Sequence, residues 1–167
     1  CQGPPGCGKT HMLTHVAIRS IYANIQRGGE KSVLIVSPNN EVCKSLAASV
    51  RAQRMPDGTA PRLVWIIANS GRKRVDKATA RYTLPDAAVD PPQEWRWSPL
   101  HPSKQMRLRS LFTERQTKTL PAEQERSFQS WVKEAVKETT ASAHAVVATT
   151  VQAGIRLLDE KKFSVAL

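Results

Sequence analysis

The stretch GPPGCGKT, from Gly3 to Thr10, decides the fold class of this chain. It fills every fixed position of the pattern G-x-x-x-x-G-K-T, whose glycines let successive backbone N–H groups turn toward phosphate oxygens. In this pattern the lysine, Lys9, reaches the β- and γ-phosphates of a nucleoside triphosphate, and the hydroxyl of Thr10 can ligate Mg²⁺. An amphipathic helical pattern follows, so the positive end of the helix dipole would face the same phosphates. The sequence therefore predicts a phosphate-binding P-loop.

The whole loop is expected to form the nucleotide site. Lys9 and Thr10 are the expected catalytic residues, and Thr10 is also the expected metal ligand. The residues expected to contact the nucleotide are Gly3, Pro4, Pro5, Gly6, Cys7, Gly8, Lys9 and Thr10. A plain glycine turn is the alternative interpretation, but the pattern arises by chance in only about one chain in two hundred of this length.

Helical and strand patterns alternate beyond the loop. Two helical stripes are expected to face inward, one of Leu13, Val16, Ala17, Ile21 and Ile25, the other of Val42, Leu46, Ala47 and Val50. Short apolar runs at 33–36, 63–68, 145–149 and 163–167 are typical of strands in a parallel sheet. The alternation predicts an α/β fold, a doubly wound parallel sheet with helices on both faces. The length favours one domain.

Two segments interrupt this alternation. Residues 69–102 are basic, proline-rich and without period, which favours an irregular surface loop. Within it, Trp95 and Trp97 are expected to anchor the loop rather than to stack on bases. The cluster from Arg72 to Arg74 fits a solvated loop and a phosphate contact about equally well. Residues 104–139 predict an inserted pair of antiparallel helices, 104–118 and 122–139.

Three ordered segments of the chain resemble motifs of superfamily 1 helicases, in the nonsense-mediated-decay and senataxin-like branch. They are GPPGCGKT, VLIVSPNNEVCKSLAASV (Val33 to Val50) and HAVVATTVQAG (His144 to Gly154). The family has G-P-P-G-T-G-K-T, then a strand ending in A-P-S-N-x-A-V before a helix, then a strand ending in threonine. Here Cys7 replaces a threonine and S-P-N-N replaces A-P-S-N. The family also carries a helical stalk where residues 104–139 lie.

The resemblance implies that residues 1–167 are part of a first RecA-like P-loop domain, incomplete at both ends. It implies an ATP- and Mg²⁺-dependent motor that moves along single-stranded RNA or DNA and opens duplexes. It also implies that the nucleic-acid backbone is contacted by Pro38, Asn39, Asn40, Thr149 and Thr150. An acidic Asp-Glu pair would follow Leu167 in the parent, and a second RecA-like domain would supply arginines. We therefore expect the 167 residues alone to hydrolyse essentially no ATP.

Other interpretations stay open from the sequence alone. An AAA-type ATPase also uses G-P-P-G-x-G-K-T, and a non-hydrolysing nucleic-acid-binding fragment would need only the loop and the charge. Helix capping would explain Asn39 and Asn40, and a strand edge would explain Thr149 and Thr150. Asp159-Glu160 mimics an acidic ATPase signature, but the flanking basic residues favour a solvated turn.

The overall charge favours a polyanionic partner. Lys and Arg number 25 against 14 Asp and Glu, a formal net charge of +11. The acidic parts of a longer parent could also lie elsewhere in its sequence. The three cysteines form no C-x-x-C pair, and the four histidines show no ligand spacing matched to them, so neither a disulfide framework nor a zinc site is expected. An intracellular location, cytoplasmic or nuclear, is expected, and no apolar run reaches the ~20 residues that a membrane helix needs.

Overall fold

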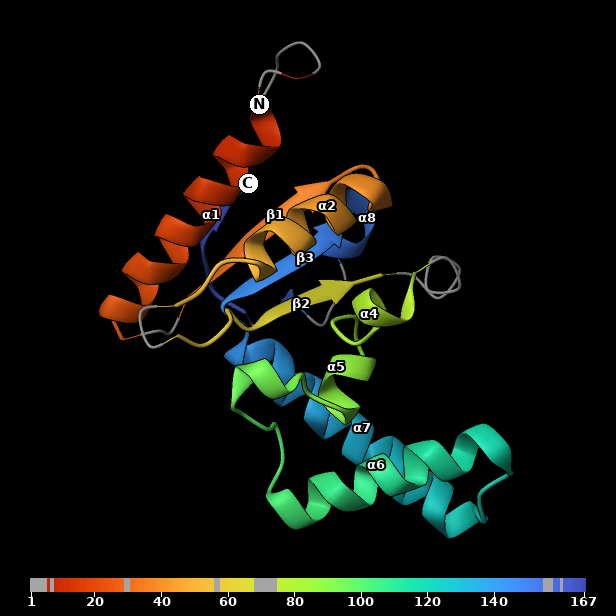
Figure 1. The fold of residues 1–167 in the computed structure, drawn as a ribbon. Coiled ribbons are helices and arrows are strands. Elements are labelled where there is room, and N and C mark those ends of the chain that lie inside the picture. Colours follow the sequence, from red (N-terminus) through yellow and green to blue (C-terminus); the bar gives the residue numbers. More distant parts are fainter. Residues whose placement is uncertain are drawn as a thin grey trace.

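The computed structural model describes residues 6, 8–28, 31–55, 58–67, 75–154, 158–159 and 161–167. Its strands are β1 (Ser32–Ser37), β2 (Leu63–Ile66), β3 (Ala145–Thr149) and β4 (Phe163–Ala166). Its long helices are α1 (Lys9–Gln26), α2 (Asn40–Arg51), α6 (Pro102–Thr117) and α7 (Ala122–Ser142). Its short helices are α4 (Lys77–Ala80), α5 (Asp86–Val89), η1 (Gln93–Trp95) and α8 (Thr150–Ala153). Figure 1 shows the sheet region with α1 and α2, and the helical pair projecting from it.

The four strands form one parallel sheet in the order β2-β3-β1-β4. Strand β3 lies between β1 and β2, with Val33 opposite Ala145 on one side and Leu63 opposite Ala145 on the other. Apart from Ser32, Ser37 and Thr149 at their ends, the central strands β1 and β3 consist of Val, Ile, Leu and Ala, as expected of strands that are covered on both faces. The predicted α/β class with a parallel sheet is confirmed at this level.

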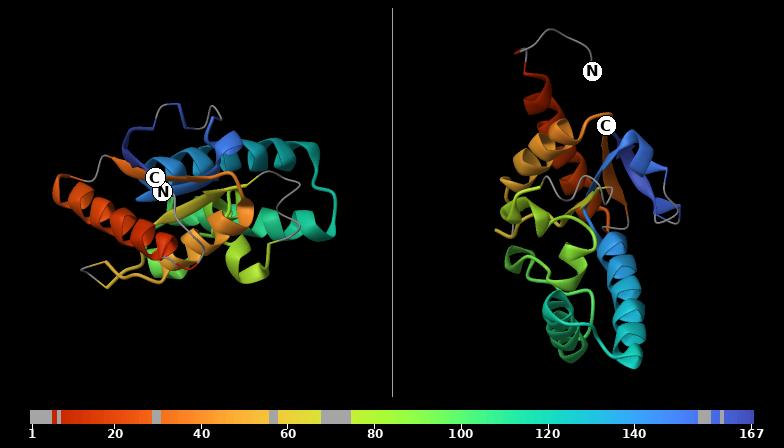
Figure 2. Two further views of the ribbon diagram at one scale, coloured as in Figure 1. Left: turned by 90° about the horizontal axis from the view of Figure 1, so that it is seen from above. Right: turned by 90° about the vertical axis from the view of Figure 1, so that its right-hand side faces the viewer.

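Alternate strand residues face two separate hydrophobic cores. Val33, Ile35 and Trp65 pack with α1 and α2, in a cluster that includes Ile21 and Leu46. Their neighbours along the strands face the opposite side, where they pack with residues of α5, α6 and α7. Figure 2 shows these two layers in views turned by 90°. The sheet is thus covered by helices on both faces.

The expected stripes on α1 and α2 are partly wrong. Val16 and Ile25 are each 38% exposed and Val42 is 43% exposed, although all three were expected to face inward. The buried positions are Thr14, Ala17, Ile18, Ile21 and Asn24 on α1, and Cys43, Leu46, Ala47 and Val50 on α2. The orientation of each helix is set by the residues that fit against the sheet, and on α1 two of these are polar.

Helices α6 and α7 form the predicted antiparallel pair. Leu108 and Leu111 of α6 are buried in the same core as Phe128 and Ala135 of α7. Arg115 and Glu125 form an ion pair across the two helices at 3.1 Å. The pair occupies the expected part of the chain, and α7 leads directly into β3.

Residues 75–102 correct the prediction of an irregular surface loop over 69–102. This part of the segment contains three short helices, and Tyr82, Leu84, Val89 and Trp95 are all less than 9% exposed. Gln105 on α6 holds it in place, because its amide donates to the carbonyls of Ala88 and Val89. The anchoring prediction for Trp95 is confirmed, and Trp97 is partly buried against the same core. Residues 68–74, with the Arg72–Arg74 cluster, lie outside the described residues.

The helices that the structure describes include none with the length and apolar character needed to cross a membrane.

Candidate nucleotide and nucleic-acid site

The start of α1 carries the described part of the predicted phosphate loop, while Gly3, Pro4, Pro5 and Cys7 lie outside the described residues. Gly6 (φ +79°) and Gly8 (φ +77°) have the left-handed backbone that glycine adopts at no steric cost. Gly8 is the N-cap of α1, and its carbonyl accepts the first helical hydrogen bond from the Met12 N–H at 2.9 Å. Both glycines thus use their conformational freedom, and Gly8 does so at a fixed position of the pattern G-x-x-x-x-G-K-T.

The first turn of α1 is suited to an anion. It has no side-chain cap hydrogen bond and contains no acidic residue, so its own side chains do not oppose the positive end of the helix dipole. Lys9 is partly exposed and Thr10 is exposed. The Thr14 hydroxyl donates to the Thr10 carbonyl at 2.8 Å, which fixes the backbone of this turn. The arrangement provides one cation and one hydroxyl next to the N–H groups of the turn.

Helix α1 runs antiparallel to the strands, so its first turn lies toward their carboxyl ends (Figure 1). Near its other end, Asn24 donates to the Ser164 hydroxyl at 2.6 Å, at the amino-terminal end of β4. From Asn24 back to Lys9 the helix spans about 22 Å, whereas β1 from Ser32 to Ser37 spans only about 17 Å. The described part of the predicted loop at the start of α1, Gly8 to Thr10, therefore lies at or beyond the carboxyl edge of the sheet.

The carboxyl ends of β1 and β3 carry the predicted nucleic-acid contacts. Ser37 and Thr149 are opposite each other in the parallel register, and each strand then turns into a helix. Pro38, Asn39, Asn40 and Thr150 are exposed. The structure thus brings the two predicted groups, 38–40 and 149–150, together on neighbouring strand ends.

The side chains of Asn39 and Thr149 both cap helices. The side-chain amide oxygen of Asn39 accepts from the Glu41 N–H at 2.8 Å, and the Thr149 hydroxyl oxygen accepts from the Gln152 N–H at 3.3 Å. Capping uses an acceptor in each case, which leaves the amide NH₂ of Asn39 and the hydroxyl proton of Thr149 as donors. Capping and donation to a phosphate are therefore chemically compatible at both residues.

Two contacts around α2 hold this edge in place, and the sequence did not predict them. The Cys43 thiol is buried beneath the strand ends and donates to the Ala148 carbonyl at 3.4 Å. Burial raises the pKa of this thiol. Lys44 pairs with Asp76 at 2.9 Å, which raises the pKa of Lys44 and lowers that of Asp76 well below its ordinary value. A lysine with a carboxylate 32 positions away gives no signal in sequence patterns.

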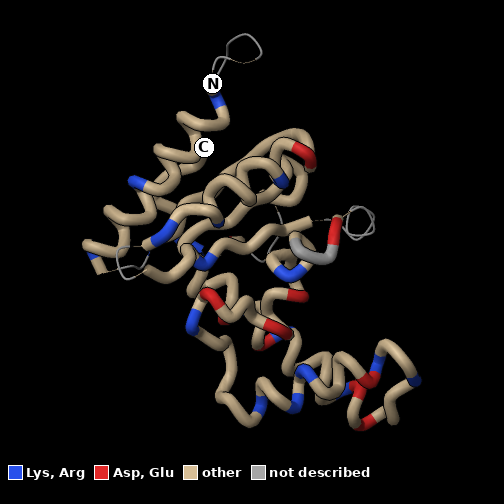
Figure 3. The backbone as a smooth tube through the Cα atoms, viewed as in Figure 1, with Lys and Arg blue, Asp and Glu red and all other residues tan. Residues whose placement is uncertain are grey.

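Basic residues outnumber acidic ones in α1 and α2. Glu41 is the one acidic residue in these two helices, whereas both signs mix on α6 and α7 (Figure 3). The helical pair also neutralises cations through ion pairs, including Arg109 with Asp90 at 2.8 Å. At the strand-end turns themselves the charges are more balanced, because Glu41 follows Asn40 and Asp76 pairs with Lys44.

Acidic metal ligands are not assembled at the described part of this edge. Among the described residues, no three His, Cys, Asp or Glu side chains are grouped as metal ligands. Asp159 is exposed in a turn, which agrees with its interpretation as a solvated turn residue, and Glu160 lies outside the described residues. Thr10 is the described side chain that fits the predicted Mg²⁺, whose other ligands would be phosphate oxygens and water.

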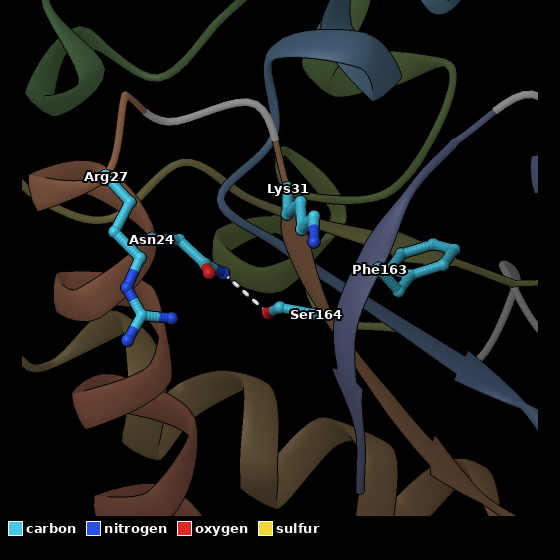
Figure 4. Close-up of a pocket in the computed structure, with 5 residues that line it drawn as sticks. All are labelled: Asn24, Arg27, Lys31, Phe163 and Ser164. Atoms are coloured by element: carbon cyan, nitrogen blue, oxygen red, sulfur yellow. Dashed lines mark hydrogen bonds between the residues drawn. The ribbon is translucent and has the colours of Figure 1, made fainter.

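A separate pocket lies at the opposite end of the sheet. It is lined by Asn24, Arg27, Lys31, Phe163 and Ser164, and Figure 4 shows the hydrogen bond between Asn24 and Ser164 that joins α1 to β4. Because it adjoins the amino-terminal ends of β1 and β4, it is remote from the strand-end turns and does not belong to the candidate site.

Comparisons with known proteins add no family to this picture: no protein-family model matches the chain, and neither does any curated protein. What the site can do is therefore judged from its own residues. One polar edge combines a helix start that has no side-chain cap, a lysine, and two strand-end turns rich in donors. Such an edge can bind phosphate groups in more than one place.

Proposed function

We propose that this chain is the ATP-binding portion of an ATP-dependent RNA or DNA helicase with a RecA-like P-loop fold. The observation that carries the proposal is the common edge on which the Gly8–Thr10 helix start and the two strand-end turns lie. In parallel α/β sheets, ligands approach at the carboxyl ends of the strands. A nucleotide site and a nucleic-acid site on one edge can be coupled mechanically through the strands between them.

The nucleotide would be held by the loop before α1. Gly6 and Gly8 turn the backbone toward the phosphates, and Lys9 neutralises charge on the β- and γ-phosphates, which matters most in the transition state. The Thr10 hydroxyl would help to hold Mg²⁺, which when bound supplies the remaining charge neutralisation. The arginines and acidic residues that complete hydrolysis would come from the parent chain.

The single strand would be held by its backbone. The Asn39 amide and the hydroxyls of Thr149 and Thr150 can donate to phosphate oxygens, which carry no sequence information. Binding should therefore show little sequence preference and a strong dependence on salt. Each phosphate contact contributes about 0.7 to the slope of log affinity against log salt on single strands.

The test is a titration of labelled single-stranded RNA and DNA of mixed sequence into the 167-residue chain, from low to moderate ionic strength. A steep negative slope supports the proposal, and a flat response contradicts it. Mg-ATP binding is measured in parallel with wild type and Lys9→Ala. Assembly into hexamers on ATP addition would instead favour an AAA-type ATPase.

A further inference from the structure

Two histidines on the exposed side of α1 form a close pair next to the proposed nucleotide loop. His11 and His15 are one helical turn apart, at i and i+4, so both lie on the same face. Their Nε2 atoms are 3.0 Å apart, in a hydrogen bond in which one ring N–H donates to the other ring. The ring centroids are 4.3 Å apart and the planes are at 79°.

The separation of the two nitrogens is that of two ligands on one metal ion. Imidazole nitrogens bind Zn²⁺ at about 2.0–2.1 Å, which places two such nitrogens about 2.9 Å apart at a right angle and about 3.3 Å apart at the tetrahedral angle. The observed 3.0 Å lies within this range. Helix α1 therefore brings both Nε2 atoms to chelating distance. Binding would replace the N–H···N hydrogen bond, with the donor ring taking the tautomer that is protonated on Nδ1, so that both Nε2 lone pairs can face the ion.

The pair opens into a pocket between α1 and α2. Its volume is about 440 Å³, and it is lined by both histidines together with Thr10 and Thr14 of α1, Ser49 of α2, and Ala52 and Gln53, which follow α2. A pocket of this size can hold a metal ion with several water ligands, since one water occupies about 30 Å³ of liquid. Both rings are exposed, so an ion can reach them from solvent.

We propose that His11 and His15 bind a late first-row divalent metal ion, such as Zn²⁺ or Co²⁺, with water completing its coordination. Imidazole favours these ions, whereas Mg²⁺ prefers oxygen ligands. The site is thus chemically distinct from the proposed Mg-ATP site that begins at Thr10. It does not depend on the chain being an ATPase.

The test is calorimetric titration of Zn²⁺ into the 167-residue chain, with excess Mg²⁺ present and without nucleotide. Wild type should bind one ion, and His11→Ala and His15→Ala should each weaken binding at least about tenfold, because even indirect partners of a metal are worth about 10–100-fold. His101→Ala is the matched control, since His101 is also exposed but lies on the N-cap of α6. Unchanged affinity in the two α1 variants would overturn the proposal.

Spectroscopy with Co²⁺ identifies the ligands directly. The bound ion should broaden the imidazole proton signals of His11 and His15 in the NMR spectrum and leave those of His101 and His144 sharp. A strong near-ultraviolet band from a cobalt–thiolate bond would show that a cysteine holds the metal, and would overturn the two-histidine assignment. Circular dichroism of each variant checks that the exposed substitutions leave the fold intact.

Discussion

Ser37 and Thr149 are opposite each other at the carboxyl ends of two adjacent parallel strands. Neighbouring strands are about 4.8 Å apart, so the turns at 38–40 and 149–150 leave the sheet side by side. A backbone phosphate that approaches one turn is within reach of donors on the other. The chain places 108 residues between these two turns, and the sheet brings them together.

Replacing Asn39 or Thr149 with aspartate separates helix capping from phosphate binding. Aspartate caps as well as asparagine and better than threonine, so Asn39→Asp and Thr149→Asp should change the free energy of unfolding by less than about 0.5 kcal/mol. The new negative charge should weaken single-stranded RNA binding at least about tenfold, because it replaces a donor to a charged phosphate. Fluorescence anisotropy and urea denaturation measure the two effects.

Gln129→Glu is the matched control for these variants, since Gln129 is an exposed residue of α7 and its substitution adds the same charge. RNA binding by this variant should stay close to that of wild type. Equal losses in the Gln129 and Asn39 variants would mean that only net charge matters, and would contradict a site at the strand ends.

The backbone conformation at Gly8 predicts that any side chain at this position lowers the stability of the fold. Gly8 has φ +77°, and nothing lies within 4 Å of where a Cβ would be, so the cost of Gly8→Ala comes from the backbone alone. Gly8→Ala should lower the free energy of unfolding by about 1–2 kcal/mol. Gly154→Ala is the control, because Gly154 has an ordinary φ of −87° and should tolerate alanine without loss. Equal thermal stability of both variants would show that the left-handed turn is not formed.

The core beneath the helical pair predicts that alanine substitutions at two nearby residues of α6 have very different effects on stability. Leu108 is 0% exposed and Met106 is 71% exposed. Leu108→Ala should destabilise the chain by about 2–5 kcal/mol, whereas Met106→Ala should change stability by less than about 0.5 kcal/mol. Urea denaturation of both variants gives the comparison. A small effect at Leu108 would mean that the helical pair does not pack on the sheet.

Lys161 predicts a dependence of stability on pH. Burial, together with the nearby Arg62 charge, lowers the pKa of Lys161 from 10.5 to about 8 in the folded chain. Between these values the unfolded chain binds more protons than the folded chain, so this group adds stability as the pH rises from about 8 to 10.5. The free energy of unfolding of wild type relative to Lys161→Met should therefore increase between pH 7 and pH 10. A difference that is independent of pH would contradict the shift.

Periodic apolar patterns located all four strands and the long helices, because a buried parallel strand needs a continuous β-branched run and a packed helix needs a stripe. They failed on the exact inward face of α1. There the buried Asn24 and Thr14 find partners in the Ser164 hydroxyl and the Thr10 carbonyl, and an apolar pattern cannot anticipate such pairings. Which polar residues face the sheet is decided by contacts distant in sequence.

The fold of residues 75–102 was even less predictable from apolar patterns. Their helices are only three or four residues long, which is too short for a period, and the fold of the segment depends on the Gln105 amide and on the burial of Tyr82 and Trp95. At the candidate site, the glycine loop and the strand-end turns could be predicted because their residue types follow from local backbone geometry. The Lys44–Asp76 and Cys43–Ala148 contacts could not, because they join separate segments.

ATP turnover in a chain extended at both ends, measured with and without single-stranded RNA, tests the proposed function most directly. The extended chain should hydrolyse ATP faster when RNA is present, and the 167-residue chain alone should show essentially no turnover. Lys9→Ala should abolish turnover in the extended chain without loss of fold, because its charge acts mainly in the transition state. Near-normal turnover by the Lys9→Ala variant, or turnover that RNA does not change, would contradict the proposed RNA- or DNA-dependent ATPase.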